Sequence, residues 1–304
     1  MFKKIITFIK RKLLHLLCVR CNFKRNNIIY YTTYDNKIVT PSFLSYDPFG
    51  SAEILFNVMN SDGIGKLVFD RPLKKIGAYT FTRSTNLESI CIPNSVKSVD
   101  SYAFNNNTIY RFYGKFASDD NRSIIIDKKL IAVALYNYND YTIPYNVTNI
   151  GSNFANVRKK SLSVEVTNQF VPNKDAFMNS YIQLITNMDT IPAETFSCNE
   201  FTNVIIGKNT KYIGDKAFLR SEGTWEYDTG EHHSSNTYCN IVCLSEIPPV
   251  IGKNVFGSLS PGTEQYWETT EFRYNRIMVP TKSVDGYKNV WKPYASYIQA
   301  ITIE

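Results

Sequence analysis

One pattern recurs along the chain and constrains its fold more than any other feature. In the copy at Ile90–Phe104 (ICIPNSVKSVDSYAF), a short apolar strand precedes a proline, two valines three residues apart and a closing aromatic residue. Phe81 lies 23 positions before Phe104, and the same step separates Phe154 from Phe177. The residues that close the copies are Phe81, Phe104, Phe154, Phe177, Phe196, Phe218 and Phe256. Repetition at a period of this length predicts copies that stack on one another.

Each copy follows the same physical logic. Alternation in Val204-Ile205-Ile206 predicts a strand whose first and third side chains point inward. Pro93 and Pro144 end the strand ladder, because proline has no N–H to donate. A glycine then follows the second inward aliphatic residue, where we expect a tight turn with positive φ. These glycines are Gly77, Gly151, Gly214 and Gly252.

A single copy cannot bury its own apolar face, whereas stacked copies bury a continuous one. The alternative is an ordinary all-β domain in which the phenylalanine spacing is coincidental. Several spacings agree within each copy, and this agreement favours the stack. A fully buried Phe side chain contributes about 1.5–3 kcal/mol, so a column of them supplies a large part of the core.

The repeat resembles the BspA-type leucine-rich repeats, whose unit runs approximately I-x-IP-x-x-V-x-x-IG-x-x-AF-x-x-x-x-x-L. Leu87 fits the final leucine, and the resemblance extends from about Ile28 to the C-terminus. It implies a mainly β leucine-rich-repeat solenoid of about 22–23-residue units, with hairpin insertions and a short C-terminal capping helix. It further implies a protein of adhesion or protein binding, without enzymatic activity.

The pattern divides the chain into a tail and a solenoid. We expect a basic N-terminal tail at residues 1–27 and the solenoid at residues 28–304. The parts of the solenoid are an N-terminal cap at 28–62, the repeats at 63–256, and an insertion with the C-terminal cap at 257–304.

Three local predictions accompany this division. Two short strands around Asp35-Asn36 predict a hairpin that caps the first repeat. Ile124-Ile125-Ile126 and Leu130–Leu135 predict a second hairpin, within a modified repeat. A short helix is expected from about Ser283, with Val284, Tyr287 and Trp291 on its inner face.

The net charge of +7 belongs to the tail. Residues 1–25 contain eight Lys or Arg residues and no Asp or Glu, which leaves −1 for the rest of the chain. We therefore expect no nucleic-acid surface on the solenoid.

The tail has two main interpretations, with a dispensable tail as the third. Lys3 and Lys4 before an apolar run are typical of a secretory signal, but Lys10-Arg11-Lys12 interrupts that run and no small-residue cleavage site follows. The tail also fits an amphipathic helix on an anionic membrane, with apolar residues near one face. Those residues are Phe2, Ile5, Ile6, Ile9, Leu13, Leu16 and Leu17. The apolar runs are shorter than the roughly 20 residues of a membrane-spanning helix.

The sequence contains no motif for catalysis or for a cofactor. Its three histidines do not form a Ser-His-Asp or Cys-His arrangement, and we expect no enzymatic activity and no cofactor. Cys239 and Cys243 lie near His232 and His233, but their spacing matches no zinc pattern, so no metal site is expected. Cys91 and Cys198 stand alone in repeat units and are expected to be small buried or half-buried apolar residues.

Two surfaces are candidates for binding. The first is the stripe of middle strand residues, which should point outward and is less polar than solvent exposure favours. It consists of Val68, Cys91, Thr142, Ile205 and Met278. The second is a pair of acidic insertions around Trp225 and Trp267, because aromatic residues are enriched at interfaces. The alternatives are a stripe covered by neighbouring structure and solvated loops.

These observations predict binding of a protein or glycan ligand, by a protein at the cell surface or secreted. The alternative is a structural or assembly scaffold on the cytoplasmic face of a membrane. Residues 1–25 would then contact the membrane.

Overall fold

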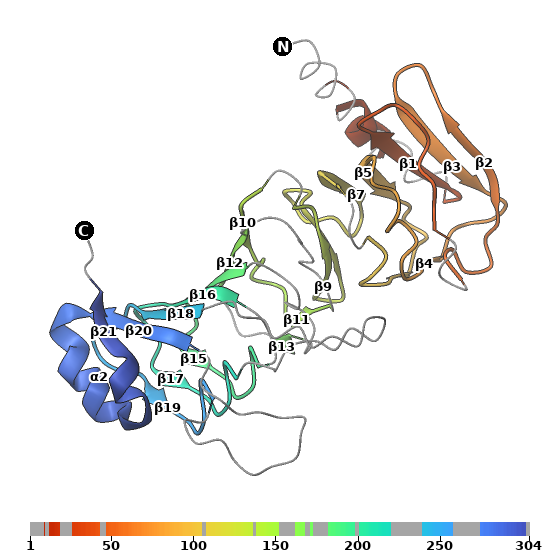
Figure 1. Ribbon diagram of the computed structural model, residues 1–304. Coiled ribbons are helices and arrows are strands. Elements are labelled where there is room, and N and C mark those ends of the chain that lie inside the picture. Colours follow the sequence, from red (N-terminus) through yellow and green to blue (C-terminus); the bar gives the residue numbers. More distant parts are fainter. Residues whose placement is uncertain are drawn as a thin grey trace, which may run out of the picture. The chain divides into compact units, whose positions relative to one another are not determined.

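The computed structural model contains two compact units, which are described separately (Figure 1). Unit 1 comprises Met1–Tyr138 and Ile150–Asn156, and unit 2 comprises Asn139–Asn149 and Val157–Glu304. The structure describes residues 9, 12–18, 26–42, 47–104, 108–135, 138–151, 162–167, 171–172, 182–197, 201–219, 239–257 and 274–301.

A five-stranded sheet forms the centre of unit 1, in the order β2-β3-β1-β5-β7. Its strands are β1 (Ile28–Thr33), β2 (Ile54–Met59), β3 (Ile64–Phe69), β5 (Leu87–Ile92) and β7 (Arg111–Gly114). A small parallel pair, β4 (Lys75–Ile76) and β6 (Ser98–Val99), lies on another side of the repeats. The rings of Phe81 and Phe104, which close two successive repeats, stack on each other with centroids 5.4 Å apart.

The strand β1 lies between the repeat strands β3 and β5 and is antiparallel to both. The predicted hairpin around Asp35-Asn36 is therefore wrong, because residues 37–40 form no strand and β1 pairs with distant partners. The first two repeat strands are consequently not neighbours. Five of the six residues of β1 are buried, as expected for a strand that is covered on both faces.

Tyr31 connects β1 with the edge strand β2 across β3. Its ring lies over Gly65, where a Cβ atom would be only 2.1 Å from the ring. The Tyr31 hydroxyl donates a hydrogen bond of 2.5 Å to Oδ1 of Asn57 on β2, and the Val39 N–H donates one to the hydroxyl. Burial raises the pKa of Tyr31 to about 12. Gly65 on β3 thus leaves space for the Tyr31 ring, whose hydrogen bond to Asn57 holds β1 in the sheet.

The predicted second hairpin is confirmed in unit 1. It consists of β8 (Ser123–Ile126) and β9 (Lys129–Val133), which are antiparallel. Asp127 and Lys128 turn the chain with φ of 49° and 62°. Two short strands, β11 (Asn149–Ile150) and β13 (Val171–Pro172), come later in the chain.

Unit 2 contains a seven-stranded parallel sheet in the order β10-β12-β14-β16-β18-β20-β21. Its strands are β10 (Asp140–Thr142), β12 (Leu162–Val166), β14 (Ile182–Thr186), β16 (Phe201–Ile206), β18 (Cys239–Cys243), β20 (Tyr274–Pro280) and β21 (Ile298–Ile301). A second parallel sheet is formed by β15 (Thr190–Ile191), β17 (Tyr212–Ile213) and β19 (Val250–Ile251). The coils that begin with β14, β16 and β18 therefore each contain one long and one short strand.

A column of phenylalanine rings fills the core of unit 2. Phe196 and Phe218 lie 5.2 Å apart between ring centroids, and Phe218 and Phe256 lie 5.8 Å apart. All three side chains are at most 1% exposed. Phe154 and Phe177, which the pattern assigns to the same role, lie outside the described residues.

The turn before each phenylalanine differs from the prediction that its glycine has positive φ. Gly214 and Gly252 do not have positive φ; instead, their backbones approach the previous coil so closely that a Cβ would be 2.3 Å from the Ala193 nitrogen and 2.1 Å from Oδ1 of Asp215, respectively. Positive φ occurs two residues before the phenylalanine, at residues other than glycine. These are Tyr79, Glu194, Lys216 and Asn254. Glycine is therefore selected here for close approach between coils and not for its freedom in φ.

The C-terminal end of unit 2 is closed by helical turns, as predicted. They are η1 (Thr281–Ser283), α2 (Val284–Val290) and η2 (Lys292–Tyr297), and α2 lies beside β20 and β21 (Figure 1). Tyr287 and Trp291 are fully buried, and the Trp291 indole donates to the Pro249 carbonyl at 2.8 Å. Trp291 also contacts the last phenylalanine of the column, Phe256, at 5.6 Å between ring centroids.

Candidate ligand-binding surface

The parallel register of unit 2 aligns one outward side chain from each long strand. This outer row consists of Thr142, Glu165, Ile185, Ile205, Val242, Met278 and Gln299. The residues before them in the strands point inward, as in Val164, Leu184 and Val204, which are fully buried. Because side chains alternate between faces along a strand, the whole row lies on the outer face of the sheet.

The middle of the outer row is aliphatic and half-buried. Ile185, Ile205, Val242 and Met278 are neighbours in register, each with part of its side chain in contact with solvent. We refer to these four residues as the aliphatic cluster.

One end of the outer row is polar and held by hydrogen bonds. Glu165 accepts a hydrogen bond from the Thr142 hydroxyl at 3.3 Å and another from the Asn187 amide at 2.9 Å. The carboxylate is therefore fixed beside the aliphatic cluster.

A second outward row runs beside the first and is polar. This amide row consists of Asp140, Ser163, Gln183, Asn203, Asn240 and Arg276. The Asn240 amide donates to Oδ1 of Asn203 at 3.4 Å. An apolar centre with a polar margin is the usual composition of a protein interface.

The structure brings together only some of the stripe residues predicted from the sequence. Thr142, Ile205 and Met278 share the outer row of unit 2, where Thr142 is exposed and the other two are half-buried. Val68 is half-buried on β3 of unit 1, in a different sheet. Cys91 is 2% exposed, so it is not part of an open stripe, and the expectation that it is a small buried apolar residue is confirmed.

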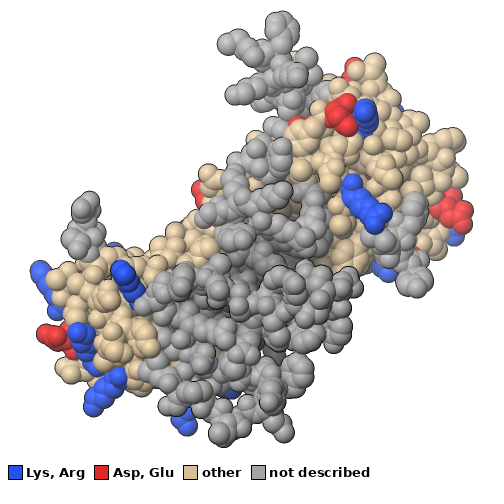
Figure 2. All heavy atoms as spheres, viewed as in Figure 1, with Lys and Arg blue, Asp and Glu red and all other residues tan. Residues whose placement is uncertain are grey.

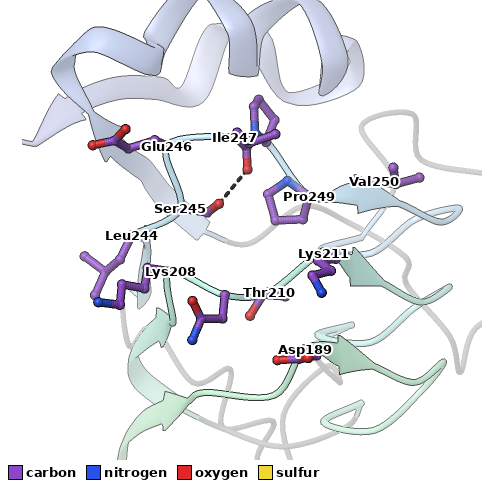
Figure 3. Close-up of a pocket in the computed structure, with 12 residues that line it drawn as sticks. Asp189, Lys208, Thr210, Lys211, Leu244, Ser245, Glu246, Ile247, Pro249 and Val250 are labelled. Carbon is purple, nitrogen blue, oxygen red and sulfur yellow. Dashed lines mark hydrogen bonds between the residues drawn. The ribbon is translucent and has the colours of Figure 1, made fainter.

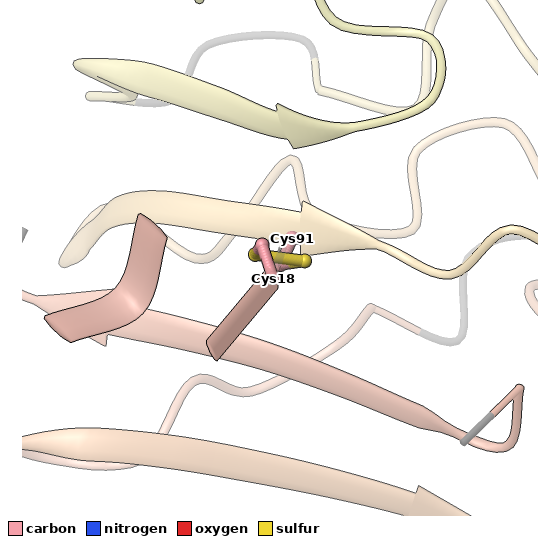
Figure 4. The surroundings of a disulfide bond; sticks show 2 residues. All are labelled: Cys18 and Cys91. Carbon is pink, nitrogen blue, oxygen red and sulfur yellow. A yellow bond between two sulfur atoms is a disulfide. The ribbon is translucent and has the colours of Figure 1, made fainter. Parts of the chain in front are cut away.

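The N-terminal helix covers Cys91. The structure describes this helix at residues 9 and 12–18. Cys18 forms a disulfide with Cys91, with their Cα atoms 6.0 Å apart (Figure 4). Leu14 and Cys18 are buried against Tyr30 of β1 and Tyr113 of β7. The predicted single apolar face is therefore incomplete, because Leu14 lies outside it and is fully buried.

Sequence reasoning missed four members of the outer row, which are Glu165, Ile185, Val242 and Gln299. Glu165 lies in a copy that matches the repeat poorly, and an insertion precedes Val242. Alternation in LSVEV, at Leu162–Val166, is the signal that places Glu165 outward.

An open groove in unit 2 was also missed. It has a volume of about 740 Å³ and lies between the turn at residues 208–211 and the loop at residues 244–250, with Asp189 beside it (Figure 3). Lys208 and Lys211 lie on one side, and Ile247 and Val250, 80% and 60% exposed, on the other. The groove carries both acidic and basic side chains, and it is a second candidate surface for binding.

Buried hydrogen bonds fix the loop that forms one wall of this groove. Ser245 donates to the Ile247 carbonyl at 2.6 Å, and Tyr287 donates to the Ser245 carbonyl at 2.8 Å. The Tyr287 hydroxyl also lies 3.0 Å from Sγ of Cys243. Burial raises the pKa of Tyr287 and of the Cys243 thiol, so both groups stay neutral.

The remaining sequence candidates receive no structural test. Trp225, Trp267, Cys198, His232 and His233 lie outside the described residues. Cys239 and Cys243 are buried and reduced in β18. Figure 2 shows several basic side chains at the end of unit 2 that carries α2, with uncharged side chains between them, and the absence of nucleic-acid binding stays a prediction.

The sequence matches the family model described as BspA type leucine rich repeat region, in 6 copies, over residues 56–183 and 125–227. These matches together cover more than half of the chain, and the chain belongs to this family. The predicted fold class is confirmed: the protein is a mainly β leucine-rich-repeat solenoid with a short C-terminal helix.

Two solved structures are similar to this chain at low identity. The pneumococcal vaccine antigen PcpA is 17% identical with a TM-score of 0.34, and the similarity covers 76% of this chain and 66% of that chain. A leucine-rich repeat protein from Bacteroides ovatus is 13% identical with a TM-score of 0.28, over 88% of this chain and 99% of that one. The chain thus spans slightly less than two thirds of PcpA. Comparison with curated proteins finds no significant match.

Proposed function

We propose that this protein is a non-enzymatic binding module that recognises a protein ligand through the outer face of unit 2. The observation that carries the proposal is the aliphatic cluster of Ile185, Ile205, Val242 and Met278, aligned in register beside the amide row. The BspA-type family is a repeat-scaffold family, which supports an interaction role.

The chemistry of the two rows favours a protein over a glycan. A cluster of half-buried aliphatic side chains stabilises a complex when apolar side chains of a partner cover it. Amides such as Asn203 and Asn240 both donate and accept hydrogen bonds, which suits the backbone of a partner at the margin. A glycan that hydrogen-bonds to the same amide row is the second candidate ligand.

The disulfide supports a location outside the cytoplasm. Disulfides such as Cys18–Cys91 form and persist in oxidising compartments and are rare in the cytosol. We therefore favour a cell-surface or secreted protein over the alternative, a scaffold on the cytoplasmic face of a membrane. Among the described residues, no helix has the length and apolar character needed to span a bilayer.

A matched pair of substitutions tests the proposed function. Ile205→Lys places a positive charge in the aliphatic cluster. Val68→Lys is the control, because it places the same charge at a half-buried outward position of unit 1. Immobilised wild-type and variant proteins are incubated with extracellular and envelope proteins, and the captured proteins are quantified by mass spectrometry. A parallel glycan array tests the second candidate.

We expect at least one protein whose capture falls by about tenfold or more with Ile205→Lys, as for a residue at the centre of an interface. The same protein should be retained by Val68→Lys. Circular dichroism establishes that both variants are folded. If every captured protein responds equally to the two substitutions, the proposal is wrong; if only glycan binding responds to Ile205→Lys, the ligand is a glycan.

A further inference from the structure

The N-terminal helix has two apolar sides, of which only one packs on unit 1. Leu14 and Cys18 are 0% and 3% exposed against the sheet. Ile9, Leu13 and Leu16 are 51%, 38% and 47% exposed. We refer to these three residues as the exposed stripe.

Helical geometry separates the exposed stripe from the packed side. At about 100° per residue, Ile9, Leu13 and Leu16 lie within about 60° of one another around the helix axis. Leu14 lies about 100° or more from each of them. Because one side is occupied by the sheet, the stripe cannot be covered by the same contact.

The disulfide fixes this arrangement covalently. Cys18 lies at the end of the described helix, and Cys91 lies on β5, between β1 and β7. The helix is held with its packed side on Tyr30 and Tyr113. Rotation that would bury the exposed stripe would break these contacts and strain the bond.

The charge around the stripe indicates what covers it. The first 25 residues contain eight basic residues and no acidic one, while the rest of the chain has a net charge of −1. Lys12, on the helix itself, is exposed. A basic helix with exposed aliphatic residues binds at the interface of an anionic bilayer, where the apolar residues enter the headgroup region and the cations contact the lipid charges.

We propose that the exposed stripe binds the surface of an anionic lipid bilayer while the disulfide holds the other side of the helix on unit 1. The helix then lies between the membrane and the sheet, and unit 1 has a defined orientation on the lipid. This site is separate from the outer face of unit 2, so either proposal can fail without the other.

Vesicle binding of the oxidised full chain tests the proposal. The probes are vesicles of phosphatidylcholine alone and of equimolar phosphatidylcholine and phosphatidylglycerol, and binding is measured by co-sedimentation. The variant Leu13→Gln plus Leu16→Gln removes most of the stripe without touching the packed side. The matched control, Leu55→Gln plus Val58→Gln, changes two residues on β2 that are 53% and 50% exposed.

We expect the wild type to bind the anionic vesicles and to bind neutral vesicles at least about tenfold more weakly, with binding reduced by salt. The stripe variant should lose about tenfold or more on anionic vesicles, because aliphatic burial in the interface supplies part of the affinity. The β2 control should bind as the wild type does. Peptide mapping without reductant should find Cys18 linked to Cys91.

Three results would overturn the proposal. If the wild-type protein does not bind anionic vesicles, a lipid surface is excluded as the partner of the stripe. Equal binding by the stripe variant and the wild type excludes the stripe as the contact. A wild-type dimer that the stripe substitutions dissociate in the absence of lipid identifies a second copy of the chain as the occupant.

Discussion

The five-stranded sheet of unit 1 and the seven-stranded sheet of unit 2 differ in what covers their outer faces. In unit 1 the antiparallel strand β1 separates two repeat strands, and the N-terminal helix covers Cys91 and its neighbours. In unit 2 all seven strands are parallel, and the aliphatic cluster stays in contact with solvent. The same repeat thus produces a covered face where other segments pack on it, and an open face where none of the described segments does.

The comparison assigns different roles to the two units. The covered face of unit 1 contributes to stability and is held by a disulfide. The open face of unit 2 keeps apolar side chains in partial contact with water, which costs free energy unless a partner covers them. If the units are independent, a substitution in one unit should leave the stability of the other unchanged.

The largest effect is expected from breaking the phenylalanine column of one unit. Phe218→Ala in unit 2 and Phe81→Ala in unit 1 each remove a fully buried ring, and each should lower the free energy of unfolding by about 3–5 kcal/mol. Hydrogen exchange under increasing urea should localise each loss to its own unit. Tyr145→Ala, at a site that is 83% exposed, is the control and should change stability by less than about 0.5 kcal/mol. If Phe218→Ala weakens β5 as much as β16, the units are not independent.

Removal of the disulfide should destabilise unit 1 alone. The bond joins residues 73 positions apart, and loss of a link over a loop of this size costs about 2–4 kcal/mol. The double variant Cys18→Ser plus Cys91→Ser should therefore show faster exchange in β1 and β5, with β14 and β16 unchanged. Reductant should reproduce this effect in the wild type and add nothing in the double variant. Equal protection of unit 1 in both proteins would contradict the structure.

Tyr31→Phe tests how much the hydrogen bonds of the Tyr31 hydroxyl stabilise β1 in the sheet. It removes the hydrogen bond to the half-buried Asn57 and leaves the buried Val39 N–H without this acceptor, at a cost of about 1–3 kcal/mol.

The same tyrosine predicts a pH dependence. Its pKa is raised from 10.0 to about 12 in the folded protein, so the neutral form is favoured by folding. The resulting stability is complete below pH 10 and is lost as the pH rises from 10 to 12. Urea titrations across this window should show a smaller decline for Tyr31→Phe than for the wild type; an identical decline would exclude Tyr31 as its source.

The smallest expected effect is an increase in the stability of unit 2. Gly286 lies in α2, where a Cβ would meet its nearest heavy atom, Cγ of Pro248, at 3.7 Å. Gly286→Ala should stabilise unit 2 by about 0.5–1 kcal/mol, because alanine restricts the unfolded chain and favours the helix. Thermal unfolding measures the gain. Gly252→Ala is the contrast and should destabilise, because its Cβ would lie 2.6 Å from the Asp215 nitrogen.

The periodic part of the fold could be predicted from the sequence. The 22-residue spacing of Phe196 and Phe218, with the same local pattern before Phe256, predicts a column of rings, and alternation places Ile205 and Met278 on the outer face. Both features depend on local period, which a single sequence displays directly.

The non-periodic part could not be predicted in this way. The position of β1 depends on antiparallel pairing with strands more than 30 residues away, and no local pattern encodes that choice. The Cys18–Cys91 bond likewise joins the tail to a repeat, and cysteine spacing alone does not reveal its partner. Tyr79 and Lys216 carry the positive φ that the pattern assigned to glycine, whereas Gly214 and Gly252 lie where the backbone closely approaches the previous coil.

The candidate site was predicted in part for the same reason. Thr142 and Ile205 lie in copies that match the repeat well, whereas Glu165 lies in a copy that matches it poorly. The groove beside Ile247 depends on how two turns from different coils lie in space, which the period does not determine.

The most direct test of the open face is a photocrosslinking measurement. A benzophenone amino acid is placed at Ile205 in one protein and at Val68 in another, and each is irradiated with extracellular and envelope proteins. We predict a covalent adduct with a foreign protein from position 205 and none from position 68. Adducts of equal yield from both positions, or from position 68 alone, would contradict the assignment of ligand binding to the outer face of unit 2.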